Sequence, residues 1–133
     1  MNENFNTDNI KIVLVDDSDF SRSMIKKMLS DAGFQVVGEA HSAEKAMEVI
    51  RDKKPNIVIT DIVMPSISGI ELTEKINKTF DHIAIVVISS LSQEHIVLEA
   101  IGAGASDFLT KPINQEQLID SIQKISKQIQ ADL

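Results

Sequence analysis

Three short and almost uninterrupted runs of apolar residues, rich in β-branched side chains, constrain the fold of this chain more than any other feature. They cover residues 10–15, 57–59 and 83–88. A strand that is apolar at nearly every position has both faces buried, which is typical of the interior of a parallel sheet. Residues 34–37 and 108–109 form weaker runs of the same kind. We therefore expect five strands.

Helical patterns of apolar residues separate the expected strands. Gly33 is suited to end the first helix, because glycine readily adopts the backbone conformation that follows a helix. Ser42 is expected to cap the second helix, and Asn114 with Gln117 forms a capping-box pattern before the last one. The apolar positions at helical spacing are Phe20, Met24, Ile25 and Met28; Ala43, Ala46, Met47 and Ile50; Leu72, Ile76 and Phe80; Val97, Ala100 and Ile101; and Leu118, Ile122, Ile125 and Ile129.

The alternation of five strands with five helices predicts an α/β fold in a single domain. Right-handed crossovers between parallel strands place helices on both faces of an open parallel sheet. The length of 133 residues is the usual size of one domain. We expect the domain to cover residues 10–133, after a polar N-terminal tail at residues 1–9 and with no output domain behind it.

Charge and composition argue against several classes of function. Thirteen basic and twenty acidic residues give a net charge of −7, which is unfavourable for nucleic-acid binding. The chain has no cysteine, which removes disulfides, thiol catalysis and cysteine-based zinc sites. No stretch approaches the roughly 20 apolar residues of a membrane span, and the N-terminus lacks a signal-peptide pattern, so we expect a cytoplasmic protein with no membrane partner.

Polar and charged residues follow four of the expected strands. Asp16 and Asp17 follow the first strand, Asp61 the third, Ser89 the fourth, and Lys111 the fifth. In open α/β sheets the functional site lies beyond the carboxyl ends of the strands, so these side chains should meet at one edge. Each residue taken alone is as well explained by a turn or a buried hydroxyl. The joint pattern at successive strand ends predicts a site.

Three carboxylates and an ammonium at one edge favour a particular chemistry. Clustered carboxylates repel one another, and a divalent cation with oxygen ligands relieves that repulsion. Mg²⁺ commonly binds one or two carboxylates and a phosphoryl oxygen. A remaining carboxylate can act as a nucleophile and form an aspartyl phosphate, while the lysine and the hydroxyl contact other phosphoryl oxygens.

The same residues carry a resemblance to a known family. The sequence is similar to the response regulator receiver family, especially to its single-domain chemotaxis members of the CheY-like type. The likeness covers roughly residues 10–130. The matching segments are Val-Asp-Asp-Ser at 15–18, Arg22, Asp-Ile-Val-Met-Pro at 61–65 followed by Gly69, Ile-Ser-Ser at 88–90, Gly-Ala-Ser-Asp-Phe at 104–108, and Lys-Pro at 111–112.

This resemblance implies a fold, a metal and a nucleophile. The implied fold is the flavodoxin-like receiver fold, with five parallel strands in the order 2-1-3-4-5. Asp61 is implied to be the phosphoacceptor. Asp17 would bind Mg²⁺ directly and Asp16 through water, and Asp61 with the backbone carbonyl of Val63 would complete the protein ligands. Mn²⁺ is expected to substitute for Mg²⁺.

The resemblance also implies a switch and an output surface. Ser89 would be the switch hydroxyl, Phe108 the coupled switch aromatic and Lys111 the phosphate-binding lysine. The bond from Lys111 to Pro112 is commonly cis in this family. The output face would consist of the fourth helix, the fifth strand and the fifth helix, with Val97 and Phe108 near its centre. Phenylalanine replaces the more usual tyrosine at position 108, so a switch here must work by burial and not by a phenol hydroxyl.

The implied function is a phosphorylation-driven switch of a two-component system. A sensor histidine kinase would transfer a phosphoryl group to Asp61, and the chain, expected to be a monomer, would then bind a downstream protein such as a flagellar motor switch or a relay protein. Val63 and Leu91 flank the phosphorylation site and are apolar, so we expect slow self-hydrolysis of the phosphoryl group.

Several other functions remain as alternatives. A phosphorelay intermediate or a phosphate sink would use the same site. An aspartyl-nucleophile phosphatase or phosphomutase would need its nucleophile at the end of the first strand and a second acid two residues later, as in Asp17-Ser18-Asp19, but also a cap for which the chain is too short. A receiver fold that has lost phosphorylation would not retain the full acidic set, and a flavodoxin-like FMN carrier would need hydroxyls and amides where the first turn has carboxylates.

Overall fold

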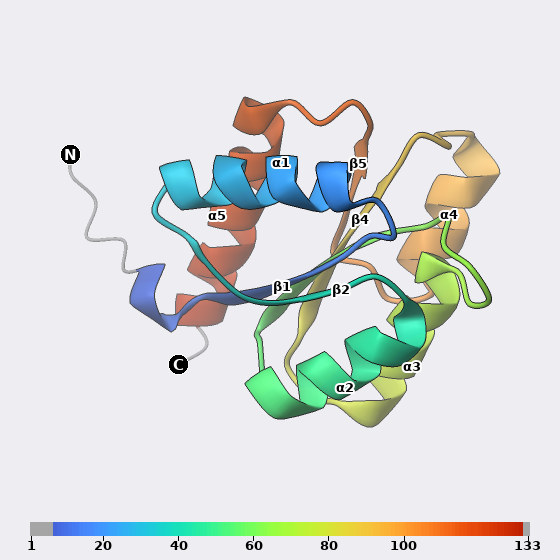
Figure 1. The fold of residues 1–133 in the computed structure, drawn as a ribbon, viewed down its shortest axis with the longest axis horizontal. Helices are drawn as coiled ribbons and strands as arrows, with labels where there is room; N and C mark the ends of the chain where they lie inside the picture. The colour runs from blue at the N-terminus through green and yellow to red at the C-terminus, as the bar shows by residue number, and fades with distance from the viewer. Residues whose placement is uncertain (1–6, 132–133) are drawn as a thin grey trace.

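Five parallel strands form one sheet in the computed structural model, which describes residues 7–131. Their order is β2-β1-β3-β4-β5, as the resemblance implies (Figure 1). The strands are β1 (Lys11–Val15), β2 (Gln35–Ala40), β3 (Ile57–Asp61), β4 (Ala84–Ser89) and β5 (Asp107–Thr110). The helices are η1 (Thr7–Asn9), α1 (Asp19–Asp31), α2 (Ala43–Lys53), α3 (Gly69–Thr79), α4 (Glu94–Gly102) and α5 (Gln115–Ala131).

Helices cover both faces of the sheet, which confirms the predicted α/β class. Helices α1 and α5 lie on one face, and α2, α3 and α4 lie on the other (Figure 1). Each face has its own cluster of buried apolar side chains. We call them the α1–α5 core, which includes Ile25, Leu29 and Ile122, and the α2–α4 core, which includes Ile50, Leu72 and Ala100. The three central strands contribute to both cores because alternate side chains point to opposite faces.

The predicted helix ends are confirmed where capping residues marked them. Ser42 and Asn114 accept backbone hydrogen bonds from Lys45 and Gln117 across the first turns of α2 and α5. Gly33 has a φ of 89°, and the amides around it close the end of α1 by bonding back to the last turn of that helix. Among the described residues, no helix is long and apolar enough to cross a bilayer.

Two expectations about elements were inaccurate. Strand β2 runs to Ala40, three residues beyond the predicted end, because its polar second half pairs with β1. The pairing register between the two strands shifts between Ile12 and Val13. The apolar face of α1 is also narrower than its spacing predicts, because Phe20 is 74% exposed and Met24 is 43% exposed.

Candidate metal centre

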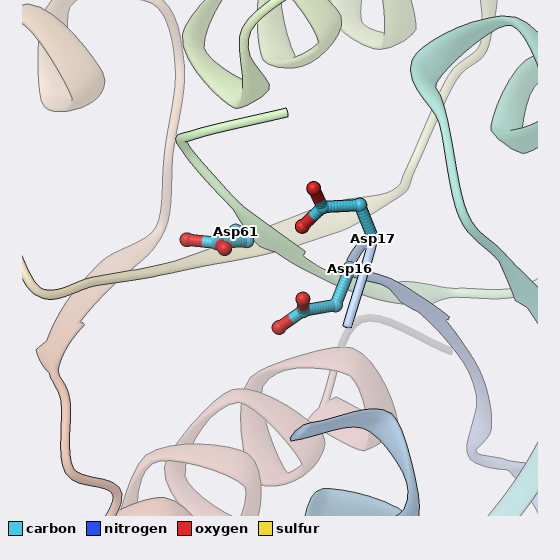
Figure 2. A group of neighbouring side chains, drawn as sticks. All are labelled: Asp16, Asp17 and Asp61. Carbon is cyan, nitrogen blue, oxygen red and sulfur yellow. The ribbon is translucent and has the colours of Figure 1, made fainter. Parts of the chain in front are cut away.

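Three aspartate side chains converge at the carboxyl edge of the sheet. Asp16 and Asp17 follow β1, and Asp61 is the last residue of β3, the neighbouring strand. Each offers a carboxylate oxygen, and these three oxygens lie within 4.8 Å of one another. Figure 2 shows the carboxyl groups of Asp16 and Asp17 turned towards the side on which the Asp61 carboxyl lies. The structure therefore brings together the three acids that the sequence predicts to lie close to one another.

Hydrogen bonds fix both the main chain and the side chain of Asp16. Its amide N–H donates to the carbonyl of Ala40 in β2, at 3.1 Å. Its Oδ1 accepts from the Ser18 amide at 2.9 Å, and its carbonyl oxygen accepts from Arg22 Nη1 at 2.6 Å. Asp16 is only 3% exposed, whereas Asp17 is exposed. The pair thus presents one fixed carboxylate and one that reaches into solvent.

Asp61 is fixed by its own neighbours and by the start of α3. The Ile62 amide donates to Asp61 Oδ1 at 2.8 Å, and the Thr60 hydroxyl donates to the Asp61 carbonyl at 2.9 Å. Gly69, the first residue of α3, passes so close to that carbonyl that a Cβ on it would lie 2.0 Å from the oxygen. The Gly69 amide also donates to the carbonyl of Ile62 at 2.9 Å. Glycine at position 69 is therefore a steric requirement of the loop.

Lys111 bridges two of the acids. Its Nζ donates to Asp16 Oδ2 at 3.1 Å and to Asp61 Oδ2 at 3.3 Å. Its own amide donates to the carbonyl of Ser89, and the bond from Lys111 to Pro112 is cis. Burial lowers the pKa of Lys111, but the hydrogen bond to Asp16 and the charge of Asp61 outweigh it, so the pKa lies above its usual value. The ammonium is therefore charged at neutral pH.

The carboxyl group of Asp61 is more difficult to ionise than a free aspartate. Burial raises its pKa, and the charge of Asp16 adds to the increase, while the charge of Lys111 offsets part of it. The folded protein therefore binds more protons than the unfolded chain between the ordinary aspartate pKa and the raised one, and stability falls as pH rises through that window. At neutral pH the ionised Asp61 opposes folding.

Asp61→Asn should therefore raise the melting temperature of the metal-free protein at pH 7. Melting curves in EDTA would measure the gain, which should shrink as pH falls towards the ordinary aspartate pKa of about 3.9. Millimolar Mg²⁺ should raise the melting temperature of the wild type, because binding to the folded state stabilises it. Asp52→Asn changes an exposed acid by the same charge and is the control. An equal gain in both variants would attribute the effect to net charge.

The other predicted site residues lie on β4, β5, α4 and the loops after β3 and β4. Ser89 is fully buried at the end of β4, and its Oγ accepts from the Leu91 amide at 2.9 Å. Phe108 is partly buried against the α2–α4 core. Val63 is 56% exposed and Leu91 is 37% exposed, so both apolar side chains reach the solvent beside the site. Val97 is half-buried on α4, whose exposed apolar residues are Leu98 and Ile101.

Two residues near the acids have contacts that their position in the sequence did not specify. Arg22 belongs to the matching segments, but the sequence assigns it no role. Its side chain connects Asp16 to Glu39 in β2, and its Nε donates a hydrogen bond of 3.1 Å to Glu39 Oε1. Asp19, the second acid of the phosphatase alternative, pairs with Arg22 and has a side chain that is 92% exposed. Asp19 is outside the group of three converging acids, so the geometry gives the phosphatase alternative no support.

The donor set fits a hard divalent cation. Its side-chain donors are carboxylate oxygens from two neighbouring strands, which is the ligand chemistry that Mg²⁺ prefers. The raised pKa of Asp61 reflects burial and carboxylate repulsion, which a cation would relieve. The arrangement can therefore hold Mg²⁺ and leave Lys111 to neutralise an anionic ligand.

Comparisons with known proteins show which family the sequence and the fold resemble. The family model of the response regulator receiver domain matches residues 12–123. The chain is 38% identical over 117 residues to a chemotaxis protein CheY of Thermotoga maritima, covering 88% of this chain and 98% of that one. It is 37% identical over 114 residues to CheY of Bacillus subtilis, covering 86% and 95%. The response regulator domain of Thermotoga maritima CheB has a similar structure, with a TM-score of 0.81 and 32% identity over 89% of this chain and 96% of that one.

Proposed function

Because this chain belongs to the response regulator receiver family, whose function is a phosphorylation switch, we propose that Asp61 accepts a phosphoryl group from a sensor histidine kinase in a Mg²⁺-dependent reaction. The observation that carries this proposal is the convergence of Asp16, Asp17 and Asp61 beside Lys111. Phosphorylation then changes which protein the chain binds. The chain transfers the group to itself and releases it slowly, so it acts as a signalling switch and not as an enzyme with a separate substrate.

Each residue of the site has a separate role in the phosphoryl transfer. An Asp61 carboxylate oxygen forms a bond to phosphorus while the bond from phosphorus to the donor nitrogen breaks, and the donor keeps that electron pair. Lys111, already within hydrogen-bond distance of Asp61, moves its contact to a phosphoryl oxygen. Asp16, Asp17, Asp61 and the carbonyl of Val63 would hold Mg²⁺ or Mn²⁺. The metal would neutralise negative charge that develops on the phosphoryl oxygens.

Uptake of phosphate from a small acyl phosphate tests this proposal without the kinase. The purified protein with acetyl phosphate and Mg²⁺ should gain one phosphoryl group per chain, because the site itself supplies the positioning and the counter-charge. Intact-mass spectrometry would measure the gain, and hydroxylamine should remove it. EDTA should prevent uptake. Uptake that persists in EDTA would contradict the metal-dependent mechanism.

The switch is proposed to begin at Ser89. A hydroxyl can accept one hydrogen bond and donate another, and Ser89 Oγ already accepts from Leu91. We propose that it donates to a phosphoryl oxygen on Asp61, and that its inward movement makes room for Phe108 to bury. Phe108 is already packed against the core that contains Ala100 of α4, so its burial would reach the output face around Val97.

Amide NMR signals would follow the switch. Beryllium trifluoride, a phosphate mimic, should shift signals at residues 89–92 and 106–113 as well as those beside Asp61. Ser89→Ala should keep phosphorylation but weaken the distant shifts, because the connecting hydroxyl is gone. Ser90→Ala, at the exposed neighbour, is the control. Distant shifts of full size in Ser89→Ala would rule out the hydroxyl as the connection.

The phosphoryl group is proposed to be long-lived. Hydrolysis needs a water molecule held in line with phosphorus, opposite the Asp61 oxygen. The exposed side chains of Val63 and Leu91 lie in the loops after β3 and β4, and we propose that they flank this approach. Neither can hydrogen-bond a water molecule, and both can exclude one. A slow loss of phosphate suits a relay or a sustained signal.

The double change Val63→Asn with Leu91→Glu should accelerate phosphate loss roughly tenfold, which corresponds to about 1.4 kcal/mol of barrier. Decay of the phosphorylated protein after removal of the donor, at constant Mg²⁺, measures the rate. Leu98→Glu makes a similar change at an exposed residue of α4 and should leave the rate unchanged. A wild type that decays as fast as the double variant would contradict the role of the two residues.

The downstream partner is proposed to be a protein that contacts α4, β5 and α5. Similarity to CheY of two species favours a chemotaxis pathway, with a flagellar motor switch as the target. A relay protein is the alternative target, and a phosphate sink would need none. The net charge of −7 supports neither nucleic acid nor an anionic membrane as a partner. We propose a single receiver domain over residues 10–133 that acts as a monomer in the cytoplasm.

A further inference from the structure

Arg22 forms the most extensive side-chain network beside the three acids. It lies in the first turn of α1, and its side chain is only 15% exposed. Its Nη1 donates to the Asp16 carbonyl at 2.6 Å, its Nε donates to Glu39 Oε1 at 3.1 Å, and its Nη2 pairs with Asp19. One guanidinium thus connects the turn after β1, the strand β2 and the start of α1.

The bond to Asp16 acts on the peptide group that joins the two metal-site acids. The carbonyl that accepts from Arg22 belongs to the peptide between Asp16 and Asp17. Fixing the plane of this peptide fixes the backbone rotation that aims the Asp17 side chain. Asp17 is exposed, so the main chain is what fixes the direction in which its side chain leaves the backbone. Asp16 is held separately by Ala40, Ser18 and Lys111.

Glu39 fixes Arg22 from the opposite side. Its carboxylate accepts from Arg22 and, at 3.0 Å, from Lys26 one turn further along α1. The hydrogen bond from Lys26 and burial act in opposite directions on the pKa of Glu39, and with the contribution of Arg22 the pKa is lowered. Glu39 is therefore ionised at neutral pH and keeps the guanidinium in place.

We propose that Arg22 is a positioning residue for the metal and phosphoryl site, acting through the Asp16 carbonyl, and that Glu39 holds Arg22 in the orientation this requires. The inference rests on the proposed Mg²⁺-dependent phosphorylation. An arginine is needed because its planar fork of donors can serve three acceptors at fixed angles. A lysine has the same charge on a flexible stem and cannot make all three bonds at once.

Arg22→Lys separates this role from a purely electrostatic one. The charge is kept, so a counter-charge role predicts wild-type behaviour. A positioning role predicts about tenfold weaker Mg²⁺ binding, equivalent to about 1.4 kcal/mol, and a lower rate of phosphoryl uptake that high Mg²⁺ restores in part. Glu39→Gln should weaken Mg²⁺ binding in the same direction by a smaller factor. Lys27→Gln removes a charge from the same helix that pairs with the exposed Asp31, outside the Arg22–Glu39 network, and is the matched control.

Melting temperature as a function of Mg²⁺ concentration measures affinity without any phosphoryl donor, and melting in EDTA measures the folded state alone. Amide NMR signals of residues 16–18 in EDTA should move in Arg22→Lys and stay in place in Lys27→Gln. Wild-type Mg²⁺ affinity in Arg22→Lys, with a lower melting temperature in EDTA, would reduce Arg22 to a structural contact and overturn the inference. A wild type that neither binds Mg²⁺ nor takes up phosphate would instead contradict the proposed function.

Discussion

Asp61→Asn should abolish phosphoryl uptake from acetyl phosphate, whatever the concentration of Mg²⁺. The amide that replaces the carboxylate is neither an anionic nucleophile nor a good ligand for a hard cation. Lys111 would keep its bond to Asp16, so the fold around the site should persist. Intact-mass spectrometry after incubation with the donor gives the result directly. This is the largest effect that any single substitution in the chain should have on phosphorylation.

Asp17→Asn gives the informative comparison for that experiment. It removes one proposed metal ligand but keeps the nucleophile, so uptake should fall at low Mg²⁺ and recover in part at high Mg²⁺. Asp52→Asn, on the exposed side of α2, should take up phosphate at the wild-type rate. If Asp61→Asn acquires a phosphoryl group as readily as Asp52→Asn, the nucleophile is another residue and the proposed mechanism fails.

Gly69→Ala should cause the largest loss of stability among substitutions near the site. A Cβ at this position would lie 2.0 Å from the Asp61 carbonyl oxygen and 2.8 Å from the carbonyl carbon. Both atoms are backbone at the end of a central strand, so they cannot turn aside as a flexible side chain would. Overpacking of this kind costs about 3 kcal/mol, which for a chain of this size lowers the melting temperature by about 10 °C.

The same substitution should also slow phosphorylation, because relief of the clash must move the main chain of Asp61. Gly102→Ala is the matched control, since an added Cβ there meets no heavy atom within 4 Å. Gly102 is the last residue of α4, where alanine favours the helix, so stability should stay level or rise by about 0.5 kcal/mol. Thermal melting of both variants in EDTA decides the comparison. Equal melting temperatures for the two variants would show that the loop yields without cost.

The sequence predicted the site well because the site depends on strand ends. Parallel strands bring their carboxyl ends to one edge, so a charged residue directly after a buried apolar run has a predictable location. Asp16 follows such a run directly, Asp17 and Asp61 lie one residue further on, and Lys111 follows the short strand β5; the structure brings all four together. Helix ends that carry a capping side chain or a suitable glycine could be predicted equally well from the sequence, as at Ser42 and Gly33.

Contacts between segments that are far apart in the sequence could not be predicted in this way. The second half of β2 contains Gly38 and Glu39, which disfavour strands in isolation. Tertiary pairing with β1 and the ion pairs from α1 to Glu39 hold this segment in the sheet. The role of Arg22 depends on the same packing, because its acceptors lie up to 17 residues away. Exposure of Phe20 likewise depends on which neighbours cover α1, and periodicity alone does not specify them.

The division of the apolar interior into two cores separates two kinds of evolutionary change. The α1–α5 core contains neither Phe108 nor any residue of α4, whereas the α2–α4 core contains Ala100 and Ala105 and packs against Phe108. Substitutions in the first core change stability without touching the side chain of Phe108 or helix α4, although β5 and α5 also contribute to this core. Under the proposed switch through Phe108, substitutions in the second core change stability together with the balance between the resting and active forms. A lineage can therefore adjust heat tolerance through the first core with a smaller effect on the signal threshold than through the second.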